Sequence, residues 1–211
     1  MPEKKRRDRL IQLAMAHPTW ALGCGDDVWW SRLAQPNHHA WTEADAKHKL
    51  QELTPPLEDP DPKALAWYGL LVRPAPHQTD QMWLRCVTGR PVSAVTIALL
   101  AWCSAPLAAH GCTALCLLWD NASWQRSHAG QRWMRQHNQQ GKQGAVGVRL
   151  VVCQLPSKSP WLNPIEPKWV HGKRAVSEPD RLLSAAELEA RVYAYYSCER
   201  ETHLVMPKKV A

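Results

Sequence analysis

The chain has 211 residues, and 45% of them are hydrophobic. This is enough for one domain with a real core and excludes an intrinsically disordered protein. The 26 Lys and Arg residues outnumber the 19 Asp and Glu residues and give a formal net charge of +7. That charge favours a polyanionic partner, nucleic acid above all.

The seven cysteines are scattered, contain no CxxC pair and lie mostly in apolar runs, which is typical of buried free thiols. A zinc site built from His110, Cys112 and Cys116 would lack the usual paired ligand spacing, so none is expected. No apolar run approaches the length of a membrane span, and the charged first residues do not resemble a signal peptide. We therefore expect a reduced, cytoplasmic compartment.

The first half of the chain predicts one helix and three strands. Residues 3–16 form a basic helix that Pro18 ends, either a linker helix that touches DNA or a solvated cap on the domain. Strands are predicted at 20–32, 64–72 and 81–88. Only turns and loops separate these strands, so they can run antiparallel.

The second half alternates helices and strands. The predicted elements are a buried helix at 93–108, a strand at 114–119, a polar helix at 127–140, a strand at 148–155, a helix opened by Asn163 and Pro164, and a helix after a capping box at Ser184, with Leu188, Val192 and Tyr195 on its apolar face. Three antiparallel strands followed by parallel strands joined by helices satisfy the crossover rules. The expected fold is therefore α/β and ribonuclease H-like, with a mixed five-stranded sheet flanked by helices.

Three acidic residues stand at the ends or centres of these elements. Asp26 lies within the first strand, Asp120 ends the strand after the first buried helix, and Glu166 is the expected third residue of a later helix. The strand that carries Asp26 and the strand that ends at Asp120 are neighbours in this topology. The helix that carries Glu166 can return to the same edge. Carboxylates in this arrangement suit hard cations, and two such ions can promote an in-line displacement at a phosphodiester. Each acid alone also fits a structural role in a turn or a first helical turn.

The segments Asp26–Trp30, Leu118–Ser123 and Leu155–Trp169 resemble the catalytic motifs of insertion-sequence transposases of the IS630 group, in the Tc1/mariner superfamily. The resemblance covers most of residues 19–196, in order. It implies that Asp26, Asp120 and Glu166 form a DDE triad that binds two Mg²⁺ or Mn²⁺ ions. It further implies hydrolysis of a phosphodiester at the element end and attack of the released 3′-hydroxyl on target DNA, usually at a TA dinucleotide.

Two features depart from that family. Its first motif is commonly Asp-Glu, whereas this chain has Asp26-Asp27, so either acid could be the first metal ligand, and Asp26 is favoured. Members also normally carry an N-terminal helix-turn-helix region. We expect only a basic linker helix over residues 1–18 before a catalytic domain over 19–211, with no helix-turn-helix domain; a separately encoded subunit could supply one.

Four residues near Glu166 are candidates for DNA contacts, namely Lys158, Trp161, Lys168 and Lys173. Lys173 lies on the same helical face as Glu166 and could reach a phosphate, and Trp161 could stack on a base. His171 could be a general base or a phosphate contact, although a plain surface histidine is the simpler interpretation. Trp169 could also stack on a base, although most tryptophans of the chain are expected in the core or at an interface. The expected partners are element ends and target DNA, with a possible homodimer at the bacterial nucleoid.

Two further interpretations of the function stay open. One is a non-catalytic DNA-binding remnant of a transposase. The other is a ribonuclease H-type nuclease that acts on RNA–DNA hybrids.

Overall fold

A computed structural model gives the fold and describes residues 2–33, 55–89, 92–120, 127–142, 147–156, 159–176 and 181–205. The strands in these segments are β1 (Trp20–Ser31), β2 (Ala64–Arg73), β3 (Gln81–Thr88), β4 (Ala114–Trp119), β5 (Arg149–Gln154) and β6 (Leu204–Val205). The helices are α1 (Pro2–Ala16), α2 (Ser93–Ala109), α3 (His128–Lys142), α4 (Glu166–Val176) and α5 (Ala185–Tyr195), with a 3-10 turn η1 (Pro160–Leu162) before α4.

The strands form one mixed sheet in the order β5-β4-β1-β2-β3-β6. β1, β2 and β3 run antiparallel, whereas β4 and β5 follow β1 in parallel, as the sequence predicts. The predicted number of five strands is wrong, because the described residues form a sixth. β6 pairs in parallel with Val87 and Thr88 of β3. A strand of two residues is too short to show a period-two pattern in the sequence.

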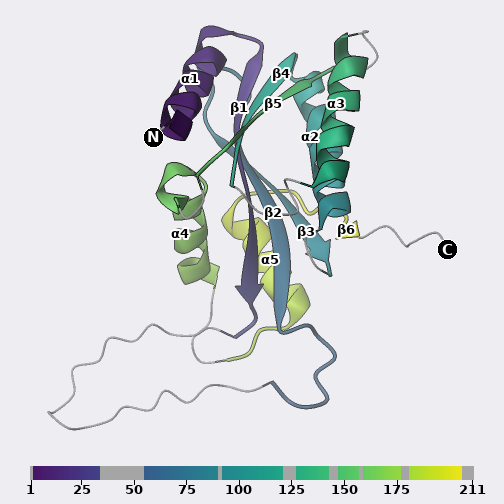
Figure 1. Cartoon of the computed structure of the whole chain (residues 1–211). Helices are drawn as coiled ribbons and strands as arrows, with labels where there is room; N and C mark the ends of the chain where they lie inside the picture. Colours follow the sequence, from purple (N-terminus) through teal and green to yellow (C-terminus); the bar gives the residue numbers. More distant parts are fainter. Residues whose placement is uncertain are drawn as a thin grey trace, which may run out of the picture.

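Helices cover both faces of this sheet (Figure 1). α1, α4 and α5 lie on one face, and α2 and α3 lie on the other. Side chains alternate along β1, so Cys24, Val28 and Trp30 enter the core beneath α4 and α5. Ala21 belongs to the opposite core, beneath α2. The chain thus has two apolar cores separated by the sheet.

The N-terminal helix packs against the sheet while most of its charges stay in solvent. Leu10 and Ala14 are buried in the core shared with α4 and α5. A guanidinium N–H of Arg7 donates to the carbonyl oxygen of Leu162 at 3.3 Å, which ties α1 to the turn before α4. The division into a linker helix over 1–18 and a catalytic domain over 19–211 stays a prediction.

Two helix details differ from the sequence-based prediction. α4 begins at Glu166, so Asn163 and Pro164 lie in the preceding turn and Glu166 is the first rather than the third helical residue. In α5 the expected cap is confirmed, since the Ser184 hydroxyl accepts from the Glu187 N–H at 3.1 Å. The buried face of α5 includes Tyr193, whereas Tyr195 is 42% exposed.

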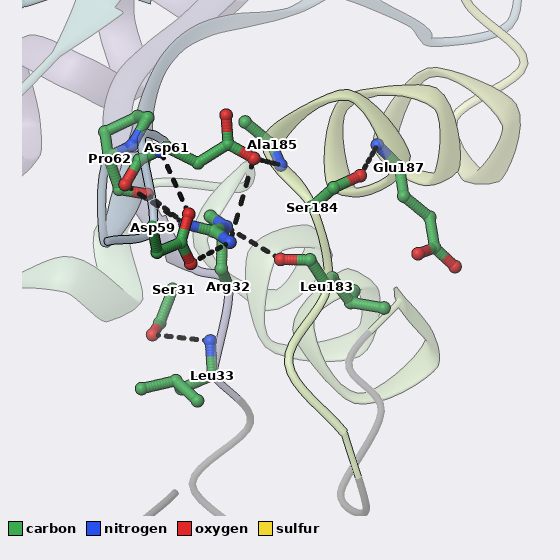
Figure 2. A network of polar contacts seen from close by, with 10 residues as sticks. All are labelled: Ser31, Arg32, Leu33, Asp59, Asp61, Pro62, Leu183, Ser184, Ala185 and Glu187. Carbon is green, nitrogen blue, oxygen red and sulfur yellow. Dashed lines mark hydrogen bonds and ion pairs between the residues drawn. The ribbon is translucent and has the colours of Figure 1, made fainter. Parts of the chain in front are cut away.

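A buried arginine joins the end of β1 to the start of α5 (Figure 2). The Arg32 side chain is 3% exposed and donates to Asp59 Oδ2 and to the carbonyl oxygen of Leu183, each at 2.7 Å. Asp61 Oδ2 in turn accepts from the backbone N–H of Ala185 at 2.8 Å. We call this set the Arg32 network. It holds α5 against the residues that precede β2.

The cysteines are free thiols in the structure. Cys198 is half-buried and the other six are buried. None of the helices in the described segments combines the length and the apolar character needed to cross a membrane.

Candidate active site

Asp26 lies in the middle of β1 on the face that α4 and α5 cover. Its side chain alternates with those of Cys24 and Val28, which belong to the core beneath these helices. Asp26 is 7% exposed, so its carboxylate is largely withdrawn from water. By the same alternation Asp27 projects to the other face of the sheet, where it is half-buried.

The pairing of β1 with β4 brings Asp120 next to Asp26. The two strands run parallel, with Gly25 beside Trp119, the last residue of β4. The next residue in each chain segment is an acid, Asp26 in one and Asp120 in the other. The charge of Asp120 raises the pKa of both Asp26 and Glu166, so these three acids interact electrostatically.

Two hydrogen bonds tie the region around Glu166 to β1. The side-chain amide of Asn163 donates to the carbonyl oxygen of Gly25 at 3.1 Å. The indole N–H of Trp169 donates to Asp26 Oδ2 at 3.0 Å. Since Asn163 and Trp169 flank Glu166 in the chain, these contacts hold the first turn of α4 against β1 at Gly25 and Asp26. Asn163 therefore serves as a tertiary anchor rather than as the helix cap that its sequence context predicts.

Two acids of this cluster, Asp26 and Glu166, have raised pKa values. Burial raises the pKa of Asp26 to about 8, and the charges of Glu166, Asp120 and Asp27 add to the rise. The Trp169 hydrogen bond acts in the opposite direction because it favours the carboxylate. Burial and Asp120 also raise the pKa of Glu166, whereas Lys173 lowers it.

The three acids interact without forming a closed cage. Within the described segments, no group of three or more His, Cys, Asp or Glu side chains is arranged to hold a metal ion.

The candidate DNA-contacting residues lie on the outer surface of the same region. Trp161 in η1 is 73% exposed, and Lys168 and Lys173 are exposed on α4. His171 is exposed as well, as expected for a surface histidine. Lys158 lies outside the described residues.

Comparison with protein families decides the relationship of this chain. The model of a family described as DDE superfamily endonuclease matches residues 82–189, a range that contains Asp120 and Glu166. The chain belongs to this DDE endonuclease family. Asp26 precedes the matched range.

Solved structures of Mos1 transposase share the fold of this DDE endonuclease domain. The Mos1 paired-end complex with left transposon end has a TM-score of 0.59 and 11% identity, over 94% of this chain and 55% of that one. The Mos1 mariner paired-end complexes with Mn and with Mg have TM-scores of 0.56 and 0.55, each at 12% identity. The match to the Mn complex covers 94% of this chain and 56% of that chain. The match to the Mg complex covers 93% of this chain and 55% of that chain.

These matches confirm the predicted ribonuclease H-like fold, and this chain spans about 55% of the length of the Mos1 chains. The comparison with curated proteins finds no match.

The sequence predicts a cluster of Asp26, Asp120 and Glu166 but not the contacts that other side chains make with Asp26. Most tryptophans are expected in the core or at an interface, and Trp169 is 3% exposed, yet its hydrogen bond to Asp26 is not expected. Gly69, which lies directly opposite Asp26 in the β1–β2 pairing, has no predicted role either. The available signal is a glycine inside an otherwise apolar strand, which marks a site of close approach.

Proposed function

We propose that this chain is the catalytic domain of a DNA transposase of the IS630 group. It hydrolyses a phosphodiester at the end of a mobile element and transfers the released 3′ end to target DNA. The observation that carries this proposal is the electrostatic cluster of Asp26, Asp120 and Glu166 in a DDE-family domain. A solvated acidic surface would not require the burial of Asp26 or its hydrogen bond from Trp169 of α4.

The chemistry of the cluster suits divalent cations. Carboxylate oxygens are the ligands that Mg²⁺ and Mn²⁺ prefer, and the crowded charge of Asp26 would be offset by such an ion. We assign Asp26, Asp120 and Glu166 as the residues that hold two ions. The choice of Asp26 over Asp27 is supported by its position on the face that carries α4. When bound, such a pair polarises the phosphate and activates the attacking oxygen.

The chain's own residues would orient the DNA around this cluster. Lys168 and Lys173 are exposed on the helix that begins with Glu166 and can neutralise phosphates there. Trp161 is exposed in the turn just before that helix and offers a surface for base stacking. Lys158 completes this proposed DNA-contacting set. We assign the reading of the element ends to a helix-turn-helix subunit rather than to residues 19–211.

The test is nicking of supercoiled plasmid DNA in Mg²⁺ or Mn²⁺. The wild-type chain is expected to nick the plasmid, and Asp120→Ala is expected to abolish nicking while the circular dichroism spectrum stays unchanged. Asp80→Ala is a matched control, because Asp80 forms an exposed ion pair with Arg73. DNA binding without cleavage would instead support the non-catalytic remnant, and preferential cleavage of an RNA–DNA hybrid would support a ribonuclease H-type nuclease.

A further inference from the structure

Trp169 connects the helix of Glu166 directly to Asp26. It follows Glu166 by three residues in α4, so the two side chains share one side of the helix. The indole is buried, and its N–H donates to Asp26 Oδ2 at 3.0 Å. The Trp169 side chain therefore holds the Asp26 carboxylate next to the helix that begins with Glu166.

The sheet makes room for this indole at Gly69. Gly69 of β2 pairs with Asp26 of β1. A Cβ atom at residue 69 would lie 2.5 Å from Trp169 Cζ2 and would also overlap its Cη2. Only a residue without a side chain leaves the six-membered ring of Trp169 in this place. The glycine and the hydrogen bond thus belong to one arrangement.

Other buried tryptophans of the chain show that such a bond is not a general result of burial. Among the described residues, the buried indole N–H groups of Trp30, Trp67 and Trp119 have no hydrogen-bond partner. These rings pack without a polar contact. Trp169 differs from them in having a carboxylate as its acceptor.

We propose that Trp169 is a positioning residue for the phosphodiester reaction, which holds the Asp26 carboxylate in one orientation in the space that Gly69 leaves open. This inference rests on the proposed function. With Oδ2 held by the indole, Asp26 offers its remaining lone pairs to a cation in a fixed direction. Loss of a hydrogen-bonding partner behind a metal ligand typically weakens metal affinity or activity about 10–100-fold.

The central variant is Trp169→Phe, which keeps an aromatic ring but removes the N–H group. We expect the Mn²⁺ concentration for half-maximal nicking, and the Kd for Mn²⁺ measured by calorimetry, to rise about 10–100-fold. Trp30→Phe is the matched control, because it removes a buried indole N–H that has no acceptor. Trp30→Phe should leave the Mn²⁺ requirement and the Kd for Mn²⁺ unchanged, even if it lowers the thermal stability as much as Trp169→Phe does.

A second variant displaces the ring without altering any polar group. Gly69→Ala should push the indole away from Asp26 and raise the same Mn²⁺ requirement. Combining Gly69→Ala with Trp169→Phe should add little, because both changes break one interaction. Additive effects would mean that Gly69 and Trp169 act separately, which contradicts the proposal.

The hydrogen bond is also tested without metal. The indole ¹H–¹⁵N resonance that disappears in Trp169→Phe should shift in Asp26→Ala, whereas the Trp30 resonance should not. An unshifted Trp169 resonance overturns the positioning role. So does wild-type metal dependence in Trp169→Phe. A wild-type protein with neither Mn²⁺ binding nor nicking overturns the proposed function itself, and the positioning role with it.

Discussion

The carboxylate of Asp26 is buried beside two other acids, and this arrangement opposes folding when no cation compensates it. A folded-state pKa of about 8 lies far above the usual value of 3.8, so the ionised group is unfavourable in the folded protein at neutral pH. Crowded acids of this kind are expected at sites selected for activity rather than for stability.

Replacing Asp26 by Asn removes this charge and keeps an oxygen that can accept from Trp169. We expect Asp26→Asn to raise the free energy of unfolding without metal by about 1–2 kcal/mol. The same change should abolish the increase in melting temperature that Mn²⁺ gives the wild-type chain. Urea denaturation and thermal melts at neutral pH measure both effects. The exposed variant Asp80→Asn should keep the Mn²⁺ effect, and a destabilised Asp26→Asn would contradict this view of the site.

At the scale of the elements, patterns of burial predict the framework well. Apolar runs separated by turns place β1 to β5, and the capping box at Ser184 marks the start of α5 correctly. The start of α4 is predicted too early, at Pro164 instead of Glu166. Asn163 has the sequence context of a cap, but its side chain bonds to Gly25 instead. Such a long-range contact leaves no periodic trace in the sequence, and neither does the one between Trp169 and Asp26.

The Arg32 network is a buried polar link between elements that lie apart in the sequence. Arg32→Ala should lower the free energy of unfolding by about 1–3 kcal/mol, because it leaves a buried acceptor, the carbonyl oxygen of Leu183, without its donor. Its acceptors include backbone carbonyl oxygens of Asp61, Pro62 and Leu183. Urea denaturation measures the loss. Arg73→Ala, at the exposed pair with Asp80, should cost at most about 1 kcal/mol. Equal losses in the two variants would show that the Arg32 network adds no special stability.

At the scale of the whole molecule, the excess of positive charge matters most where it adjoins the acidic cluster. α1 carries exposed basic residues and is tied to the turn before α4 through Arg7. Lys168 and Lys173 are further exposed cations on α4. The net charge of +7 therefore includes exposed cations on α1 and on α4.

This placement predicts how DNA affinity responds to salt. Lys168→Ala and Lys173→Ala should each weaken binding of a duplex of any sequence, and each should lower the slope of log affinity against log salt by about 1. Fluorescence anisotropy over a range of salt concentrations measures the slope. Arg135→Ala is the control, since Arg135 is exposed on α3, on the opposite side of the sheet. If Arg135→Ala changed the slope and the two lysine variants did not, the DNA would bind on the face of the sheet that α2 and α3 cover.

The buried thiols have a practical consequence for measuring how this molecule opens. Cys24, Cys86, Cys116 and Cys153 lie in β1, β3, β4 and β5, and burial raises the pKa of Cys24 and Cys86 to about 12. Alkylating reagents attack the thiolate, so each sulfur reacts only when its own strand is exposed to solvent. Timed alkylation followed by peptide mass spectrometry would therefore rank the four strands by the ease with which they detach, with no engineered label in the chain.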